Sequence, residues 1–431
     1  MKITELRVSN YKSCREVLVR PQSLTVIIGR NAAGKSNFVD AIDFLSHVYR
    51  GGLENAVALK GGYENIAFRR ARRARSEIGF QVKAKFFAAN LRVASQVGQR
   101  PSSVPKKDGI SVEYCHDFAF RAQGRDIASD FSVTRETLSV QLKDSSGSLI
   151  DTVSIRRTSD NKVALDGDAG TELARNFVYF FEYSNSDLRN ERGVAPTELM
   201  LSLPFMSGRI LSKFLRFIRN MAIFQVSPEL ARESGVPSPN PVLSRSGQNL
   251  PAVINWLKKK APAEWLRVQE AMQEIAPEIE RIEVGYLHTK TLGLYFYEGG
   301  VSRPWTVEDM SDGTVRALAM LVSCFDPRNS VLIIEEPENS VHPWVIQNLV
   351  KSLRDISVSR NVIMTSHSPS VINSISPEDV WVAYKRAGST SVAHLVELDP
   401  QVLTDWKEGA YRLFDYIESG FVPEALPGGV A

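Results

Sequence analysis

Residues 23–49 read SLTVIIGRNAAGKSNFVDAIDFLSHVY, and this stretch decides the fold. It opens with an apolar, β-branched run at 23–29 that predicts a buried strand. A glycine-rich loop follows, and from Lys35 to about Tyr49 the apolar residues recur at helical spacing, which predicts a helix. A strand, a tight loop and a helix in direct succession are typical of an α/β protein.

The loop between this strand and helix reads GRNAAGKS and matches the pattern G-x-x-x-x-G-K-[ST]. Its glycines let successive N–H groups converge on phosphate oxygens, aided by the helix N-terminus. Lys35 would then reach the β- and γ-phosphates of ATP, and the Ser36 hydroxyl would bind Mg²⁺. The alternative is a plain glycine-rich turn, which the position between an apolar strand and an amphipathic helix disfavours. The residues expected to contact the nucleotide are Gly29, Arg30, Asn31, Ala32, Ala33, Gly34, Lys35, Ser36 and Asn37.

A second chemical motif is VLIIEEPENSVHP, residues 331–343, in which two carboxylates end a run of four apolar residues. Nucleotide hydrolysis uses one acidic residue at the end of a core strand to support Mg²⁺ and a neighbouring carboxylate to polarise the attacking water. We assign Glu335 to the metal and Glu336 to the water. The alternative is a helix N-terminus, where acidic residues are favoured by the helix dipole. Pro337 follows at once and the preceding strand is apolar, which favours the catalytic interpretation.

Two further stretches could face phosphate groups. Ser311 or Asp312 can be an ordinary N-cap of the helix predicted from residue 312. Alternatively, Ser311 and Gly313 form an anion site at the helix start, for the γ-phosphate of a nucleotide held by another subunit. His367 follows the strand predicted at 361–365, where a γ-phosphate sensor would lie, or it is simply a satisfied polar residue.

The remaining sequence alternates between strand and helix patterns. The middle of the chain favours an antiparallel sheet and then helices, and the last third returns to α/β. The pattern predicts strands at 2–9 and 77–87, a loop at 91–110, a sheet from 131 with turns at DSSGS (144–148) and DGDAG (166–170), helices at 209–222 and 249–275 (broken near Ala261-Pro262), a strand pair at 281–297, a strand at 331–334 and a helix from about 343.

The composition of the 431 residues is 43% hydrophobic and 23% charged, which is ordinary for a soluble globular protein. Three widely spaced cysteines form neither a metal pattern nor a disulfide framework, which predicts a reducing, cytoplasmic compartment. No apolar run approaches the roughly 20 residues that span a bilayer, so no membrane contact is expected. The length favours two lobes over one compact domain.

Basic residues are concentrated between residues 60 and 107, with FRRARRAR at 68–75 in the centre, although the net charge of the chain is only +3. Such a segment can bind the phosphate backbone of DNA. It can equally be a solvated face without a partner. The sequence leaves these two interpretations open.

Taken in order, the motifs resemble the head of an ABC-type ATPase, with Walker A, signature, Walker B, D-loop and H-loop. NYKSC, GRNAAGKS, MSDGTVRALA, IIEEPENSVHP and TSHSP resemble the RecF/SMC/OLD branch, in particular ATPases of bacterial antiphage and DNA-maintenance systems such as the Septu ATPase subunit. The resemblance implies a P-loop NTPase fold, a mixed sheet flanked by helices, with an inserted α+β and helical subdomain. The implied parts are an N-terminal lobe with Walker A at 1–120, the inserted subdomain at 121–280, and a C-terminal lobe with signature, Walker B, D-loop and H-loop at 281–431.

The resemblance also implies ATP and Mg²⁺ as cofactors and a homodimer or higher oligomer with ATP sandwiched between heads. Ser311 and Gly313 would face the Walker A loop of the partner, Lys12 would lie near the phosphates, and Asn339 to His342 would cross the dimer interface. The signature reads MSDGT where transporters have LSGGQ, and Glu335 stands where many ABC ATPases have aspartate. The position of the Q-loop glutamine stays open, with Gln81 as a candidate.

Absent features narrow the choice among relatives. No heptad pattern persists, so a long coiled coil is not expected. About sixty residues follow TSHSP, too few for the TOPRIM domain of OLD proteins. We therefore expect an ATPase that senses or binds DNA and controls a separate effector, a nuclease or toxin, in antiphage defence. The alternatives are a RecF-like DNA repair or maintenance ATPase and a nucleotide-gated scaffold that sequesters an effector without contacting DNA.

Overall fold

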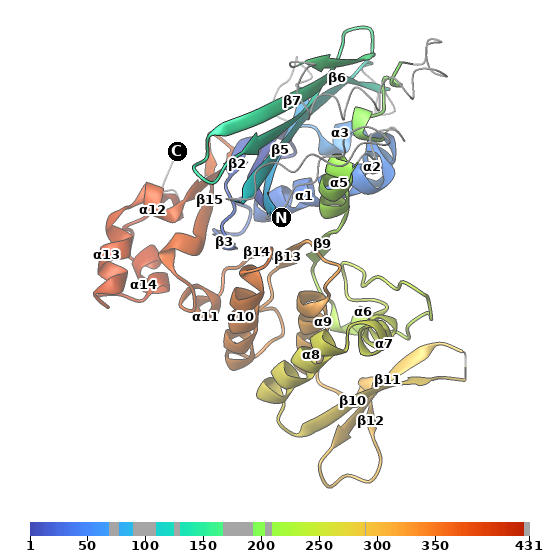
Figure 1. The fold of residues 1–431 in the computed structure, drawn as a ribbon. Helices are drawn as coiled ribbons and strands as arrows, with labels where there is room; N and C mark the ends of the chain where they lie inside the picture. The colour runs from blue at the N-terminus through green and yellow to red at the C-terminus, as the bar shows by residue number, and fades with distance from the viewer. Residues whose placement is uncertain are drawn as a thin grey trace. The chain divides into compact units, whose positions relative to one another are not determined.

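The computed structural model describes residues 1–68, 77–88, 109–124, 130–166, 193–202, 209–288 and 290–425. The chain forms two compact units, each assembled from separate stretches of sequence (Figure 1). Unit 1 comprises 1–21, 36–219 and 385–392, and unit 2 comprises 22–35, 220–384 and 393–431. In the part of the chain that the structure describes, no helix combines the length and the apolar character that crossing a membrane requires.

Unit 1 is built on an antiparallel sheet with the strand order β8-β7-β6-β5-β4-β1-β2, and β16 pairs in parallel with β2. Its long central strands largely alternate buried and partly buried residues, as in a sheet with one face packed on the core. The strands are β1 (Lys2–Tyr11), β2 (Cys14–Val19), β4 (Ile78–Ala88), β5 (Ile110–Ala122), β6 (Phe131–Lys143), β7 (Leu149–Arg157), β8 (Val163–Asp166) and β16 (Ser389–His394).

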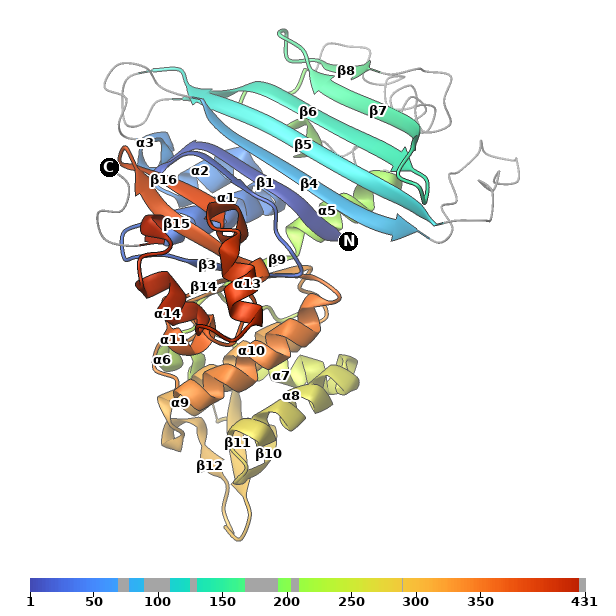
Figure 2. The same cartoon turned by 90° about the vertical axis from the view of Figure 1, so that its left-hand side faces the viewer.

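Helices cover one face of this sheet, and Figure 2 shows the strands in front of them. Aromatic rings join the first helix to the sheet, because the ring of Phe44 lies 5.5 Å from that of Tyr11 and 5.4 Å from that of Phe80. Phe80 in turn stacks on Phe118 at 5.6 Å. The helices are α1 (Lys35–Gly51), α2 (Leu53–Leu59), α3 (Tyr63–Ile66) and α5 (Arg209–Arg219).

A second set of strands, which are all parallel, forms the centre of unit 2 in the order β15-β3-β14-β13-β9. Every neighbouring pair in this set is parallel, so the carboxyl ends of all five strands lie along one edge. The core strands β3, β13 and β14 are buried along their whole length, as expected for strands covered on both faces. The strands are β3 (Leu24–Ile28), β9 (Met221–Phe224), β13 (Val331–Glu335), β14 (Asn361–Thr365) and β15 (Val380–Arg386).

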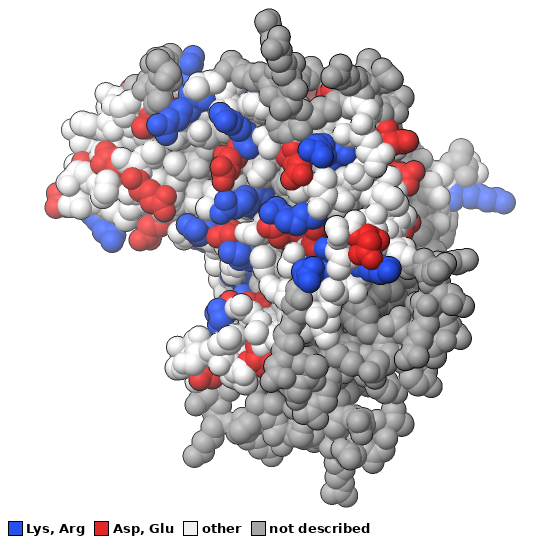
Figure 3. Space-filling model, turned by 90° about the horizontal axis from the view of Figure 1, so that it is seen from above, with Lys and Arg blue, Asp and Glu red and all other residues white. Residues whose placement is uncertain are grey.

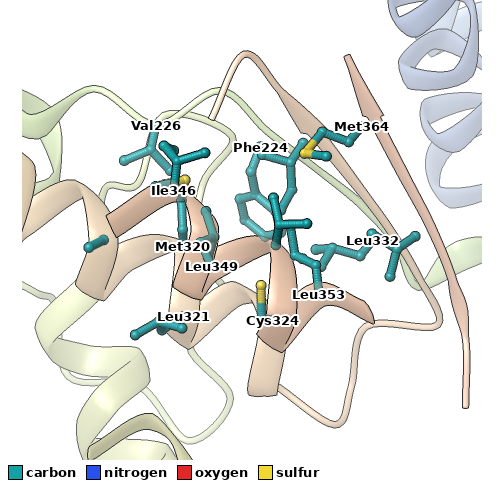
Figure 4. Packing of buried hydrophobic residues seen from close by; sticks show 14 of the residues in the cluster. Phe224, Val226, Met320, Leu321, Cys324, Leu332, Ile346, Leu349, Leu353 and Met364 are labelled. Carbon is teal, nitrogen blue, oxygen red and sulfur yellow. The ribbon is translucent and has the colours of Figure 1, made fainter. Parts of the chain in front are cut away.

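Helices α9 (Asp312–Phe325) and α10 (Pro343–Ser357) pack on these strands through a continuous apolar core. Figure 4 shows Met320 and Leu349 from the helices among Phe224, Leu332 and Met364 from the strands. Every residue of α9 from Val315 onward is buried, so this helix is held on all sides.

The remainder of unit 2 consists of a small sheet and further helices. The small sheet is antiparallel, with the order β10-β11-β12. Its strands are β10 (Ile279–Tyr286), β11 (Leu292–Glu298) and β12 (Trp305–Thr306), and the helices are α6 (Pro228–Ala231), α7 (Leu250–Lys260), α8 (Pro262–Ile275), α11 (Pro369–Ile372), α12 (Leu395–Leu398), α13 (Gln401–Lys407) and α14 (Leu413–Glu418).

Most elements predicted from the sequence are confirmed, and so is the mixed α/β fold. The helical break near Ala261 is where α7 ends and α8 begins. The turn at 144–148 is closed by a 3.0 Å hydrogen bond from the backbone N–H of Asp144 to the carbonyl of Ser148. The longest helix among the described residues is α1, with 17 residues, in keeping with the absence of a long coiled coil.

Two predictions about the middle of the chain need correction or fall outside the described residues. The helix predicted at 209–222 ends at Arg219, and Met221–Phe224 form strand β9. All four residues of β9 are buried beside β13, so sheet pairing overrides the helical spacing of this apolar run. The predicted loop at 91–110 and the turn at 166–170 lie almost entirely outside the described residues.

Candidate nucleotide site

The predicted motifs of unit 2 converge because their strands are parallel neighbours. Ile27 of β3 pairs with Thr365 of β14, and Thr365 pairs with Glu335 of β13. The segments that follow these strands are therefore the loop starting at Gly29, the acidic turn starting at Glu336, and the segment with His367. Ligands of open α/β sheets bind at this carboxyl edge.

The loop after β3 owes its shape to three residues with positive φ: Gly29 at 144°, Ala32 at 65° and Gly34 at 106°. A side chain at Gly29 would be blocked as well as strained, because a Cβ there would lie 2.2 Å from the carbonyl oxygen of Ala383. Alternation of right- and left-handed residues turns successive N–H groups to the same side, which is the geometry of an anion-binding nest. The loop is therefore suited to hold phosphate.

The side chain of Lys35 folds back onto the first residues of the loop. Its Nζ donates hydrogen bonds to the carbonyls of Gly29 and Arg30, the latter at 3.1 Å, and the residue is only 6% exposed. Burial lowers the pKa of Lys35, and the carboxylates of Glu336 and Glu338 act in the opposite direction. The ammonium is thus held at the loop by carbonyl oxygens, which a phosphate could replace.

The other predicted loop residues differ in exposure. Arg30, Asn31, Ala32 and Ser36 are exposed, whereas Ala33 and Gly34 are buried. Ser36 lies in the first turn of α1, directly after Lys35, so its hydroxyl is available to a ligand. Asn37 Nδ2 donates to Ser13 Oγ at 2.7 Å, which ties the start of α1 to the loop between β1 and β2.

Glu335, the last residue of β13, is only 3% exposed and ion-pairs with Arg245. A buried carboxylate at the end of a core strand is costly without such a partner. Arg245 was not found from the sequence, because it lies ninety positions from Glu335 in a loop between α6 and α7. Its backbone carbonyl accepts a 2.8 Å hydrogen bond from the N–H of Gln225, so this loop lies beside the end of β9.

Glu336 adopts a strained backbone with φ of 45°, which is uncommon for a residue with a side chain. Its N–H donates to the carbonyl of Thr365 at 3.0 Å, and its own carbonyl accepts from Arg316 at 2.9 Å. Asn339 Nδ2 donates to Glu336 Oε2 at 2.9 Å. The side chain is 28% exposed, so the carboxylate is fixed in direction while still reaching solvent.

His367 follows β14 and is half-exposed, with Nδ1 lying 4.0 Å from Glu336 Oε1. A third carboxylate, Glu338, lies closer, because its Oε1 is 3.4 Å from the same nitrogen. The predicted water-polarising residue and the predicted phosphate sensor are therefore neighbours. Glu338 was not singled out from the sequence, although it is the third acid of EEPE.

At the start of α9, Ser311 is the N-cap, and its Oγ accepts a hydrogen bond from the N–H of Thr314 at 3.2 Å. Asp312 ion-pairs with Arg232 at 2.7 Å. A Cβ placed on Gly313 would lie 3.4 Å from the carbonyl oxygen of Ser340, an ordinary contact distance, so Gly313 and Ser340 are neighbours. The N-cap interpretation therefore holds, and the role of Ser311 and Gly313 toward a second subunit stays a prediction.

Lys12 lies in unit 1, at the turn between β1 and β2, and its Nζ ion-pairs with Asp40 at 2.6 Å. Lys60 shares the same carboxylate at 2.6 Å and also binds Asp43 at 2.8 Å. The predicted contact of Lys12 with phosphate would compete with this cluster. The role of Lys12 stays a prediction.

The glutamine that the sequence could not place has two candidates. Gln81 lies in β4 of unit 1 and donates to Asp117 at 2.9 Å, so it is part of the antiparallel sheet. Gln225 instead follows β9, which is parallel to β13, and it is exposed. Gln225 is therefore placed at the carboxyl edge that also holds Glu335.

The basic segment at 60–107 is described only in part, since 69–76 and 89–107 fall outside the described residues. The described bases are paired: Lys60 as above, Lys83 with Glu5 at 2.8 Å, and Lys85 with Glu113 at 3.0 Å. Figure 3 shows acidic and basic side chains interspersed on the face that it displays. Paired bases offer little net charge to a phosphate backbone.

Two family profiles that match the chain are described as AAA domains, which is consistent with a nucleotide site. Residues 1–116 match a family profile described as "AAA ATPase domain", and residues 237–373 match one described as "AAA domain, putative AbiEii toxin, Type IV TA system". No curated protein matches the chain.

Among solved structures the chain is similar to SMC heads. The SMC head bound to the C-winged helix domain of ScpA has 12% identity and a TM-score of 0.48, covering 91% of this chain and 97% of that one. The SMC head domain from Thermotoga maritima has 11% identity and a TM-score of 0.38, with coverage of 91% and 99%. The SMC head with an extended coiled coil from Pyrococcus furiosus, bound to the C-terminal domain of ScpA, has 11% identity and a TM-score of 0.42, with coverage of 94% and 99%.

The class of protein follows from the site and the two matched profiles. One profile includes the Gly29–Ser36 loop, and the other includes the segment from Ser311 to His367. Together they support a P-loop ATPase of the AAA type, with an α/β sheet flanked by helices.

Proposed function

We propose that this chain binds ATP at the carboxyl edge of the unit 2 sheet and hydrolyses it, with Glu336 as the base. The observation that carries the proposal is the strained, pinned turn at Glu336. A φ of 45° is maintained by hydrogen bonds from both sides, and Asn339 directs the carboxylate. Strain of this kind persists where surrounding structure enforces it, and it is concentrated at functional sites.

Ser36 and Glu335 each offer the kind of hard oxygen ligand that Mg²⁺ prefers. A bound Mg²⁺ would neutralise charge on the transferring phosphate. In this structure the Glu335 carboxylate forms an ion pair with Arg245, so it already stabilises a cation. Gly29 permits the loop conformation, because a Cβ there would clash with the carbonyl oxygen of Ala383, and Lys35 would supply the positive charge.

His367 is proposed as the phosphate sensor and Glu336 as the group that takes the proton from water. An ionised carboxylate with one oxygen held by Asn339 leaves the other oxygen to accept that proton. His367, whose Nδ1 lies 4.0 Å from Glu336 Oε1, would contact the phosphate beside the attacked bond. This division of roles also explains why Glu336 is partly exposed whereas Glu335 is buried.

Dimerisation of the heads around ATP is the next part of the proposal. Ser311 and Gly313 at the start of α9 would complete the partner's site, and Asn339 to His342 would lie at the dimer interface. The proximity of Gly313 and Ser340 within one chain supports this, because the proposed signature and D-loop would then lie side by side in unit 2. Gln225 would act as the Q-loop glutamine.

The biological role that we propose is control of a separate effector, a nuclease or toxin, in antiphage defence, with DNA as the signal. This part of the proposal rests on the resemblance of the motifs to ATPases of such systems; the profile matched at 237–373 is itself described as a putative toxin of a type IV toxin–antitoxin system. DNA binding would depend on arginines of FRRARRAR, since Lys60, Lys83 and Lys85 are paired with carboxylates.

A nucleotide-gated scaffold that sequesters an effector without DNA is the second candidate. The pairing of the described bases favours it, because a surface whose cations are neutralised gains little from counterion release. Salt-dependent DNA binding distinguishes the two candidates. Replacing the five arginines of 69–75 by glutamine should abolish binding if DNA is the signal, and replacing Lys83 and Lys85 by glutamine is the matched control.

The central test is Glu336→Gln. We expect phosphate release to fall by about 10²- to 10⁴-fold, as for loss of a general base, while ATP affinity stays within about threefold. Size-exclusion chromatography with ATP should then show a trapped dimer. Glu308→Gln, at an exposed position, is the control. Full turnover in the Glu336 variant, or no ATP binding by the wild type, would exclude the proposal.

A further inference from the structure

Glu338 is a third carboxylate in the acidic turn, and neither its burial nor its contacts are explained by the roles of Glu335 and Glu336. Its side chain is 9% exposed, and the turn around it bends sharply, with positive φ at Glu336 and at Ser340. A charge this buried must be compensated by hydrogen bonds or opposite charges.

The compensation comes mainly from the segment that follows β14. Glu338 Oε1 accepts a hydrogen bond from Ser366 Oγ at 2.8 Å and from the backbone N–H of His367 at 2.9 Å. The imidazole Nδ1 of His367 lies 3.4 Å from the same oxygen. One carboxylate oxygen therefore contacts the hydroxyl, the backbone and the ring of two consecutive residues.

Two buried cations provide the rest of the compensation. The charge of Glu338 acts on Lys35 and on Arg316, opposing the lowering of the pKa that burial causes in both. Among the described groups, none hydrogen-bonds the second oxygen of Glu338, Oε2, which is also buried. Glu338 thus has a defined orientation toward His367 and lies in a cluster of positive charge.

We propose that Glu338 is a positioning residue that fixes the ring of His367 with its proton on Nδ1. A carboxylate facing Nδ1 favours the tautomer that carries hydrogen there, and the other ring nitrogen, Nε2, is then the one left to face the ligand. Because Glu338 and Glu336 belong to one turn, the same turn would carry the base and orient the sensor. This inference rests on the proposed function of His367.

Charge, and not merely hydrogen bonding, is the property that Glu338 contributes. Glu338→Gln keeps an oxygen that can accept from Ser366 and from the backbone of His367, but it removes the negative charge facing Nδ1. Glu338→Ala removes both. A purely structural role would leave the Gln variant close to the wild type, so the difference between these variants separates the two explanations.

The experiment is ¹⁵N NMR of the histidine-labelled 431-residue chain, which contains six histidines, at a pH where the ring of His367 is neutral. His367→Gln assigns the signal by its loss. We expect the Nδ1-protonated tautomer in the wild type and a shift toward Nε2 protonation in Glu338→Gln. In parallel, kcat of the Gln variant should fall on the order of 10- to 100-fold with KM for ATP within about threefold.

The outcomes distinguish failure of the role of Glu338 from failure of the proposed ATPase function. An Nε2-protonated ring in the wild type, or an unchanged tautomer in Glu338→Gln, overturns the role of Glu338, and the wild-type measurement does not require any Glu338 variant to fold. A lower kcat without a change of tautomer overturns it as well. If the tautomer changes but the wild type does not hydrolyse ATP, the positioning role holds and the proposed function fails.

Discussion

Gly29 is the position where a single methyl group should do most damage to both fold and site. Its φ of 144° lies where L-residues are strained, and a Cβ would come within 2.2 Å of the carbonyl oxygen of Ala383. That oxygen is a backbone atom of β15, the strand next to β3, so it cannot rotate away as a flexible side chain could. Gly29→Ala must displace either the phosphate loop or β15.

The magnitude has two parts. Forcing a residue with a Cβ into this conformation costs about 1–3 kcal/mol. Overpacking against an immobile neighbour adds about 1–3 kcal/mol. We therefore expect Gly29→Ala to lower the free energy of unfolding by about 4 kcal/mol, and the melting temperature by roughly 8–16 °C for a unit of about 150–250 residues.

Gly409→Ala is the matched control, since Gly409 has φ of 72° and no atom lies within 4 Å of where its Cβ would be. It carries the conformational cost alone, about 1–2 kcal/mol. Differential scanning fluorimetry of the two variants, and calorimetric titration with ATP, would measure the effects. Gly29→Ala should also bind ATP at least about tenfold more weakly. If both variants melt within about 2 °C of each other, the steric reasoning is wrong.

The remaining predictions concern buried polar groups. Glu136 accepts hydrogen bonds from the backbone N–H of Met200 and from the ring of His116, so Glu136→Ala should destabilise unit 1 by about 3–5 kcal/mol in thermal melts. An unchanged melting temperature would show that the network is dispensable. Burial raises the pKa of the Cys14 and Cys324 thiols to about 12, so iodoacetamide at about pH 8 should modify neither in the folded protein. The unfolded chain ionises these thiols at about pH 8.5, so their contribution to stability should be retained below that pH and fall as pH rises toward about 12. Rapid labelling of both thiols in the folded protein would contradict this.

The sequence pattern predicted the secondary structure correctly where that structure depends on residues close together in the sequence. The strand–loop–helix at 23–49 was predictable because the apolar period, the glycines and the lysine all lie within one stretch. Strand β9 was not, because Met221–Phe224 continue the apolar spacing of the preceding helix. Only the pairing with β13, which is more than a hundred residues away, makes those four residues a strand.

Partners of the site residues were hidden for the same reason. Nothing near Glu335 in the sequence indicates that Arg245 neutralises it, and nothing near Lys12 indicates that Lys60 shares its carboxylate. Each compact unit is built from several separate stretches of sequence. A division of the chain into three consecutive segments at residues 120 and 280 therefore cannot be compared directly with these units. The division into lobes therefore stays a prediction.

The acidic turn shows why adjacent carboxylates acquire different chemistry. Glu335 ends the strand with its side chain in the buried layer, where a cation must compensate it, and Arg245 does so. The positive φ at Glu336 then turns the chain, so this second carboxylate leaves the core and becomes partly exposed. Two residues later the turn returns Glu338 to a buried position against His367. One reversal of the backbone therefore gives the three glutamates different surroundings. Glu335 pairs with a cation, Glu336 reaches water and Glu338 contacts a histidine. Substituting each glutamate should therefore affect a different step of the proposed ATP hydrolysis.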